Sequence, residues 1–107
     1  MLKTDMAQPT FRALADPTRR AIISMLATRD RSIAEISAEF EMTRPAVAKH
    51  LTILREGGLV DVTPRGRERI NRLNPEGLKA VADWVNLFDR FWDDRLATLK
   101  QLVEEDQ

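Results

Sequence analysis

Cysteine is absent from this 107-residue sequence, and histidine occurs only once, as His50. Without thiols, disulfides, thiolate metal sites, iron–sulfur clusters and thiol redox switches are excluded. A lone histidine, with no second nitrogen or sulfur ligand and no paired acid, supports neither a transition-metal site nor a catalytic base. We therefore expect no metal site and no cofactor.

Long apolar runs are also missing. No segment reaches the roughly 18 to 20 apolar residues of a membrane span. Residues 1–9 lack the apolar core of a signal peptide. We expect a cytoplasmic protein without membrane contact.

The sequence contains no glycine-rich phosphate loop and no nucleophile–base pair in a recognisable motif, so no enzymatic activity is expected.

The length and composition indicate one domain. The chain is 43% hydrophobic and 32% charged, and no repeat, low-complexity run or linker divides it. We predict a single domain over residues 1–107. A chain this short buries only about two-thirds of its unfolded surface, so a second subunit would stabilise it.

The formal net charge of zero hides a separation of charge along the chain. Residues 44–72 carry seven Lys or Arg against three acidic residues, whereas residues 75–107 carry four against eight. Basic charge concentrated in one block is typical of a surface that meets an anionic partner.

Capping signals predict four short helices in the first half of the chain. The first is expected at residues 11–15. Asp16-Pro17 begins the second, Ser32 the third and Thr43 the fourth. The third and fourth helices lie on either side of a short break, so residues 32–57 form a predicted helix-turn-helix.

The second half begins with a β-hairpin. Two β-rich runs joined at Pro64-Arg65-Gly66 predict a wing over residues 59–73. Asn74-Pro75 then opens a helix that we expect to run unbroken through residues 75–103. The predicted fold is mainly α with a small hairpin (α+β), in the order α-α-α-α-β-β-α: a winged helix-turn-helix.

This arrangement suits duplex DNA. A major groove about 12 Å wide accepts one α-helix, whose N-terminal residues reach the base edges, and Arg44 is the best candidate for reading a guanine. Arg67 and Arg69 are expected to share one strand face, with Arg65 at the tip, in a comb suited to phosphates or the minor groove. The predicted DNA-binding residues are Thr43, Arg44, Pro45, Ala46, Lys49, His50, Arg55, Arg65, Arg67 and Arg69.

The last predicted helix carries more apolar surface than one small domain can cover. Two Trp and two Phe occur within residues 84–92. Such a stripe favours a homodimer over a purely intramolecular core helix. The predicted dimer interface consists of Phe11, Leu14, Leu78, Val81, Val85, Phe88 and Trp92.

Several segments resemble the ArsR/SmtB, or arsenical-resistance-repressor, family of bacterial transcriptional regulators. The resemblance spans residues 11–103, and the run 88–96 is similar to a metal-free branch of that family. It implies a homodimer, paired through its first and last helices, that binds an operator and blocks transcription, its own operon being one candidate. The segments that carry it are residues 16–20, 44–51, 54–60 and 66–69.

The sequence also departs from this family. Metal-sensing members carry Cys in the third helix, or His and acidic ligands on the last helix, and the matching segments here hold neither Cys nor His. Metal sensing through such ligands is not expected. The fourth predicted helix has Pro45, Ala46 and Ala48 near its start, and few side chains there can hydrogen-bond to bases. The operator sequence is therefore not predicted. The resemblance does not specify a small-molecule effector.

Two alternatives stay open. Charged residues on an exposed hairpin also prevent edge-to-edge aggregation without any nucleic acid. A net charge of zero also permits a winged helix used as a protein-interaction module that does not bind DNA specifically. Arg44, Lys49 and the arginine-rich hairpin favour DNA. We expect a dimer on an imperfect palindrome with half-sites about 10 to 11 base pairs apart, or a multiple of that spacing.

Overall fold

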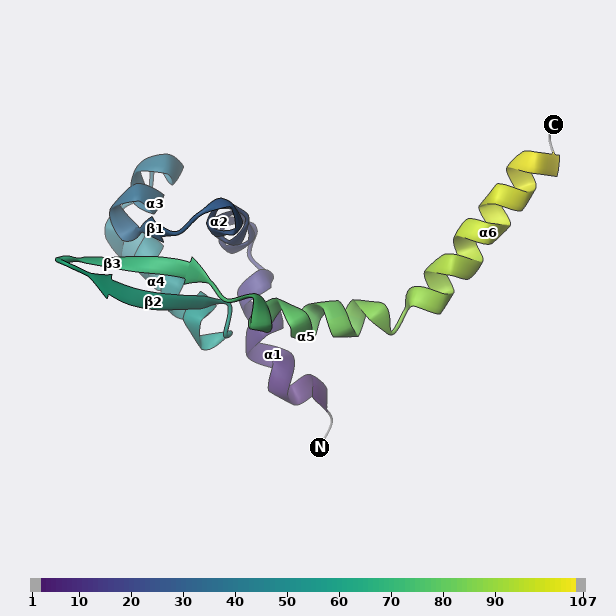
Figure 1. The fold of residues 1–107 in the computed structure, drawn as a ribbon, viewed down its shortest axis with the longest axis horizontal. Helices are drawn as coiled ribbons and strands as arrows, with labels where there is room; N and C mark the ends of the chain where they lie inside the picture. Colours follow the sequence, from purple (N-terminus) through teal and green to yellow (C-terminus); the bar gives the residue numbers. More distant parts are fainter. Residues whose placement is uncertain (1–2, 106–107) are drawn as a thin grey trace.

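A computed structural model describes residues 3–105 of the chain, with side chains from residue 8 onward. The predicted winged helix-turn-helix, mainly α with a small antiparallel sheet, is confirmed (Figure 1). The elements are α1 (Lys3–Leu14), α2 (Pro17–Thr28), β1 (Arg31–Ser32), α3 (Ile33–Phe40), α4 (Arg44–Glu56), β2 (Val60–Arg65), β3 (Glu68–Leu73), α5 (Pro75–Asn86) and α6 (Asp89–Glu105).

The core lies where α2, α3 and α4 meet the base of the hairpin. Ile22, Ile36 and Val47 are fully buried, one from each helix, and Leu54 and Leu59 complete the set of large side chains without exposure. Burial of a large apolar side chain stabilises a fold by roughly 1.5 to 3 kcal/mol. These contacts fix α3 and α4 as the helix-turn-helix.

Capping side chains begin these helices as predicted. The Asp16 carboxylate accepts a hydrogen bond from the Arg19 N–H at 3.0 Å, which lowers the pKa of Asp16. Ser32 and Glu35 form the reciprocal capping box at the start of α3, at 3.2 and 3.1 Å, and the Ser32 N–H lowers the pKa of Glu35. A side-chain oxygen at this position satisfies a helix N–H that has no partner within the helix.

The sheet has a strand that the sequence patterns did not predict. β1 contains two residues and pairs with β3, so the strand order is β1-β3-β2, antiparallel throughout. Ser32 therefore belongs to a strand pair and also caps α3. The buried side chain of Asn71 donates to the Arg31 carbonyl at 3.2 Å and ties the two strands together.

The first helix is longer than the predicted residues 11–15. α1 continues through Pro9, and the Thr10 hydroxyl donates to the Gly57 carbonyl at 2.7 Å, at the end of α4. A Cβ atom on Gly57 would lie 2.9 Å from the Pro9 carbonyl oxygen. Glycine is needed there because the two backbones approach so closely.

The prediction of one unbroken helix over residues 75–103 is wrong. The helix is interrupted at Leu87 and Phe88, whose N–H groups donate to the carbonyls three residues earlier, of Trp84 and Val85, at 3.2 and 3.0 Å. Such tight bonds end the regular helix, and Asp89 favours a new start because a carboxylate suits a helix N-terminus. Beyond this break α6 extends away from the rest of the chain (Figure 1).

No helix between residues 3 and 105 combines the length and apolar character that a membrane crossing requires.

Replacing Ser32 with alanine is expected to lower the free energy of unfolding by about 1 kcal/mol, because the Glu35 N–H loses its capping acceptor. Urea denaturation measures this change. Thr98→Ala is the matched control, since the Thr98 hydroxyl bonds the Asp94 carbonyl within the exposed α6. The control should change stability by less than about 0.5 kcal/mol. Equal losses in both variants would contradict the capping role.

Candidate nucleic-acid interface

Helix α4 has one buried face and an outward face that is free for a ligand. Val47, Leu51 and Leu54 are buried against the core, at the spacing of one helix face. Thr43 caps the N-terminus of the helix, and its hydroxyl accepts from the Ala46 N–H at 3.3 Å. The remaining faces carry the side chains that the sequence singled out.

Most of the predicted DNA-binding side chains of α4 are exposed. Ala46 and His50 are only half-buried, and His50 lies on the flank next to α2 with its Nδ1 3.5 Å from an Arg19 nitrogen. His50 thus has a neighbour within the chain that the sequence did not indicate. Thr43, Arg44, Pro45, Lys49 and Arg55 are exposed.

One outward residue of α4 was missed by the sequence interpretation. Thr52 is exposed and follows Lys49 by three residues, so helical geometry places the two on the same face. Its helical spacing from Lys49 is a signal that could have identified it.

The hairpin turn differs from the prediction at Pro64-Arg65-Gly66. The strands pair Arg65 with Glu68 and Pro64 with Arg69, so the two-residue turn is Gly66-Arg67. Gly66 has a φ of 62° at the first turn position, a conformation that favours glycine.

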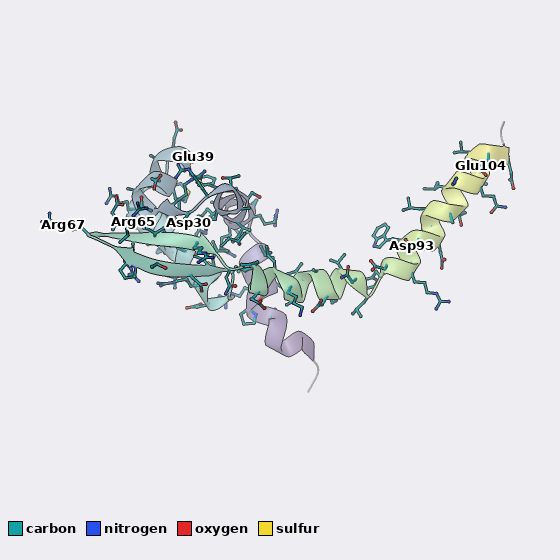
Figure 2. All side chains as sticks on the ribbon, viewed as in Figure 1. Asp30, Glu39, Arg65, Arg67, Asp93 and Glu104 are labelled. Atoms are coloured by element: carbon teal, nitrogen blue, oxygen red, sulfur yellow. The ribbon has the colours of Figure 1, made fainter. Side chains whose placement is uncertain are left out.

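The shifted turn overturns the expected arginine comb. Arg67 lies at the tip of the hairpin, and Arg65 lies behind it at the end of β2 (Figure 2). Arg65 pairs with Glu68 whereas Arg69 is the next residue along β3, so Arg65 and Arg69 point to opposite faces of the hairpin. Arg65 and Arg69 therefore carry positive charge on opposite faces of the hairpin, and Arg67 adds charge at its tip.

These basic side chains have no acidic partners in the described part of the chain. The two ion pairs found there are Arg29–Glu35 at 2.9 Å and Arg31–Glu39 at 3.2 Å, and both lie around β1 and α3. Acidic residues of α6, such as Asp93 and Glu104, lie far from the hairpin tip (Figure 2). The positive charge of α4 and the hairpin is therefore available to an anionic partner.

Arg19 and Arg20 form no ion pair with the acidic side chains that the structure describes; both donate to backbone carbonyls instead. Arg19 donates to the carbonyls of Ala13 and Arg12 at 2.7 and 3.1 Å, and Arg20 donates to the Leu14 carbonyl at 2.8 Å. Only two residues separate α1 from α2, so the first turn of α2 lies beside the end of α1. The last carbonyls of a helix lack partners within it and attract cations.

The predicted interface residues are divided between the core and the surface. Leu14 and Leu78 pack against the core, and Phe11 and Val81 are half-buried. Val85, Phe88 and Trp92 are 44%, 42% and 55% exposed. Phe88 lies in the helix break, and Trp92 lies beyond it in α6.

A row of aromatic rings joins α1 to α5. Phe11 packs edge-to-face on Trp84, with 5.8 Å between ring centroids. Trp84 packs in the same way on Phe88 at 5.2 Å. The row leads from α1 across α5 to the break that follows α5.

Comparison with known proteins gives the family. The model of a family described as "Bacterial regulatory protein, arsR family" matches residues 16–62. The HTH-type transcriptional regulator Rv2034 of Mycobacterium tuberculosis is 38% identical to this chain, over 90% of this chain and 87% of the relative. This chain belongs to the arsR family.

Two further similarities agree with the arsR assignment. The transcriptional repressor SdpR of Bacillus subtilis is 29% identical, over 80% of this chain and 96% of the relative. The solved structure of an ArsR-like transcriptional regulator from Rhodococcus sp. RHA1 is 33% identical over 94% of each chain, with a TM-score of 0.73. The predicted family and the predicted class, a transcriptional regulator, are confirmed.

For this arsR-family regulator we predict that Arg44 and Arg67 affect DNA binding differently. Arg44→Ala should cost about 1 to 3 kcal/mol and relax preference at one base pair, because a base contact is lost. Arg67→Ala should weaken binding to all duplexes and lower the slope of log affinity against log salt by about one, because a phosphate contact is lost. Fluorescence anisotropy at several salt concentrations measures both effects.

Arg95→Ala is the control for these variants, because Arg95 lies on α6 at 5.2 Å from the Phe91 ring and away from the hairpin. It should leave the salt slope unchanged. If Arg44→Ala, Arg67→Ala and Arg95→Ala changed the salt slope equally, the assignment of a base contact to Arg44 and a phosphate contact to Arg67 would be contradicted.

Proposed function

We propose that this protein binds duplex DNA as a homodimer and represses transcription. The observation that carries the proposal is the positive charge on α4 and the hairpin, which has no ion-pair partner among the side chains of residues 8–105. Phosphate contacts dominate the affinity of proteins for DNA, so such a surface suits a duplex. The relative SdpR is named a transcriptional repressor, which supports repression as the outcome of binding.

In this proposal α4 enters the major groove with its N-terminal end toward the bases. Arg44 reads a guanine, and Thr43, Pro45, Ala46 and Lys49 line the groove. The flanking position of His50 makes it the least direct contact of the predicted set.

The hairpin and the end of α4 then contact the DNA backbone. Arg67 reaches furthest from the protein, because it occupies the turn. Arg55, Arg65 and Arg69 contribute further positive charge near the phosphates.

The proposed dimer covers the exposed apolar side chains of α5 and α6. These ten side chains are 42% to 76% exposed, far more apolar surface than a soluble monomer usually shows. Aromatic side chains bury about 150 to 250 Å² each, so covering Trp84, Phe88 and Trp92 would supply much of an interface. The set is Trp84, Val85, Leu87, Phe88, Phe91, Trp92, Leu96, Leu99, Leu102 and Val103.

The same proposal assigns the protein no catalytic reaction and no metal sensing through Cys or His. The sequence has no Cys and one His, and among the described side chains of residues 8–105 no three His, Asp or Glu gather to hold a metal ion. We place the regulator in the cytoplasm, where a bacterial chromosome is found.

Footprinting of the protein on the DNA upstream of its own gene tests the proposal. We expect protection of an imperfect palindrome with half-sites about 10 to 11 base pairs apart, or a multiple, because a two-fold dimer presents two α4 helices. Zinc, cadmium and arsenite should leave the protection unchanged. A single unsymmetrical half-site would contradict the dimer, and binding that is insensitive to salt would favour the protein-interaction alternative.

Trp92→Asp is expected to dissociate the dimer and lower DNA affinity, because it places a charge in the apolar interface and leaves each monomer with one half-site. Sedimentation velocity and anisotropy on the same samples measure the two effects. Ala97→Asp is the control, since five residues along a helix turn Ala97 roughly 140° away from Trp92. A parent protein that stays monomeric at tens of micromolar would defeat this part of the proposal.

A further inference from the structure

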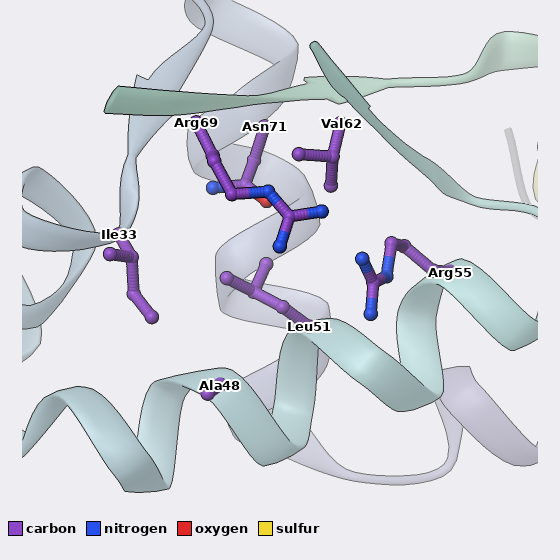
Figure 3. A pocket seen from close by; sticks show the side chains of 7 residues that line it. All are labelled: Ile33, Ala48, Leu51, Arg55, Val62, Arg69 and Asn71. Carbon is purple, nitrogen blue, oxygen red and sulfur yellow. The ribbon is translucent and has the colours of Figure 1, made fainter. Parts of the chain in front are cut away.

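A small cavity lies between α4, the start of α3 and the inner face of the hairpin (Figure 3). Its volume is about 120 Å³. The walls are mainly apolar and come from Ile33, Ala48, Leu51 and Val62. An enclosed apolar cavity of roughly 150 Å³ takes benzene, and this space is somewhat smaller but open to solvent on one side, so it suits a small apolar group that is only partly enclosed.

Two arginines from different elements meet at this cavity. Arg55 comes from the last turn of α4 and Arg69 from β3, and both guanidinium groups point over the same space (Figure 3). Neither takes part in the ion pairs formed by the described side chains of residues 8–105. Like charges that share a partly apolar space repel, and an anion between them offsets that repulsion.

The base of the cavity is held in place by the sheet. Asn71 is 3% exposed, and its side-chain amide is fixed by the Arg31 carbonyl. Val62 pairs with Asn71 across β2 and β3, which fixes the apolar wall beside it. The site is thus preformed on its strand side, which reduces the entropic cost of binding a ligand.

We propose that this cavity binds a small organic carboxylate. The carboxylate accepts hydrogen bonds from Arg55 and Arg69, since guanidinium groups match carboxylates in geometry. The apolar body packs against Leu51 and Val62. A DNA phosphate could meet the same two cations, but it has no apolar body to fill the space between α4 and the hairpin.

Binding would affect regulation, and this consequence alone rests on the function proposed above. A carboxylate at Arg55 and Arg69 neutralises two cations that the proposed DNA complex uses. The ligand and DNA would then compete, and by linkage each would weaken the binding of the other to the same degree.

Titration of the DNA-free full-length protein with benzoate, followed by NMR of backbone amides and methyl groups, tests the site. Benzoate should cause saturable shifts at Leu51 and Val62, and the neutral isostere benzamide should not. Arg55→Gln and Arg69→Gln should each weaken benzoate binding about tenfold or more, as expected for loss of one charge-assisted hydrogen bond. The matched control is Arg72→Gln, because Arg72 is exposed on the opposite face of β3 and lines a different groove.

Three results would overturn the proposal. The first is the absence of saturable shifts, and the second is equal binding of benzamide. The third is sulfate binding as tight as benzoate binding, which would make the two arginines a general oxyanion contact suited to a DNA phosphate. The titration contains no DNA, so a protein that binds benzoate but not DNA would contradict the proposed function and not the site.

Discussion

Burial of one face of α4 is the constraint on which the rest of the structure depends. Val47, Leu51 and Leu54 anchor this helix in the core. Because a helix side chain keeps its angular position, anchoring that face fixes the direction of every other face. Arg44, Lys49 and Thr52 are exposed as a result, while His50 turns toward α2 and Arg55 toward the hairpin.

The parts of the fold that local chemistry determines could be predicted from sequence. Side-chain caps act over three or four residues, so Asp16, Ser32 and Thr43 were sufficient to predict where α2, α3 and α4 begin. β1 could not be predicted in this way, because its two residues become a strand only by pairing with β3, some forty positions away.

The residues of the candidate site could be predicted from the sequence, but their arrangement in space could be predicted only in part. Helical periodicity identified the exposed cations of α4. The arrangement of the hairpin arginines depends on whether the turn forms at Pro64 or at Gly66, and one shift in register moves a side chain to the other face. The environment of Arg19 depends on the end of α1 lying beside it, which is a tertiary contact.

The segment that follows α4 lies close to the backbones of two other helices. Gly57 touches α1 on one side, and on the other a Cβ atom on Gly77, in the first turn of α5, would overlap the carbonyl of Gly58. Side-chain contacts can absorb a small displacement by changing rotamer, whereas backbone contacts cannot. A rotation of α1 relative to α5 would therefore also change the tilt of α4, because these backbone contacts leave little room for side chains to absorb the movement.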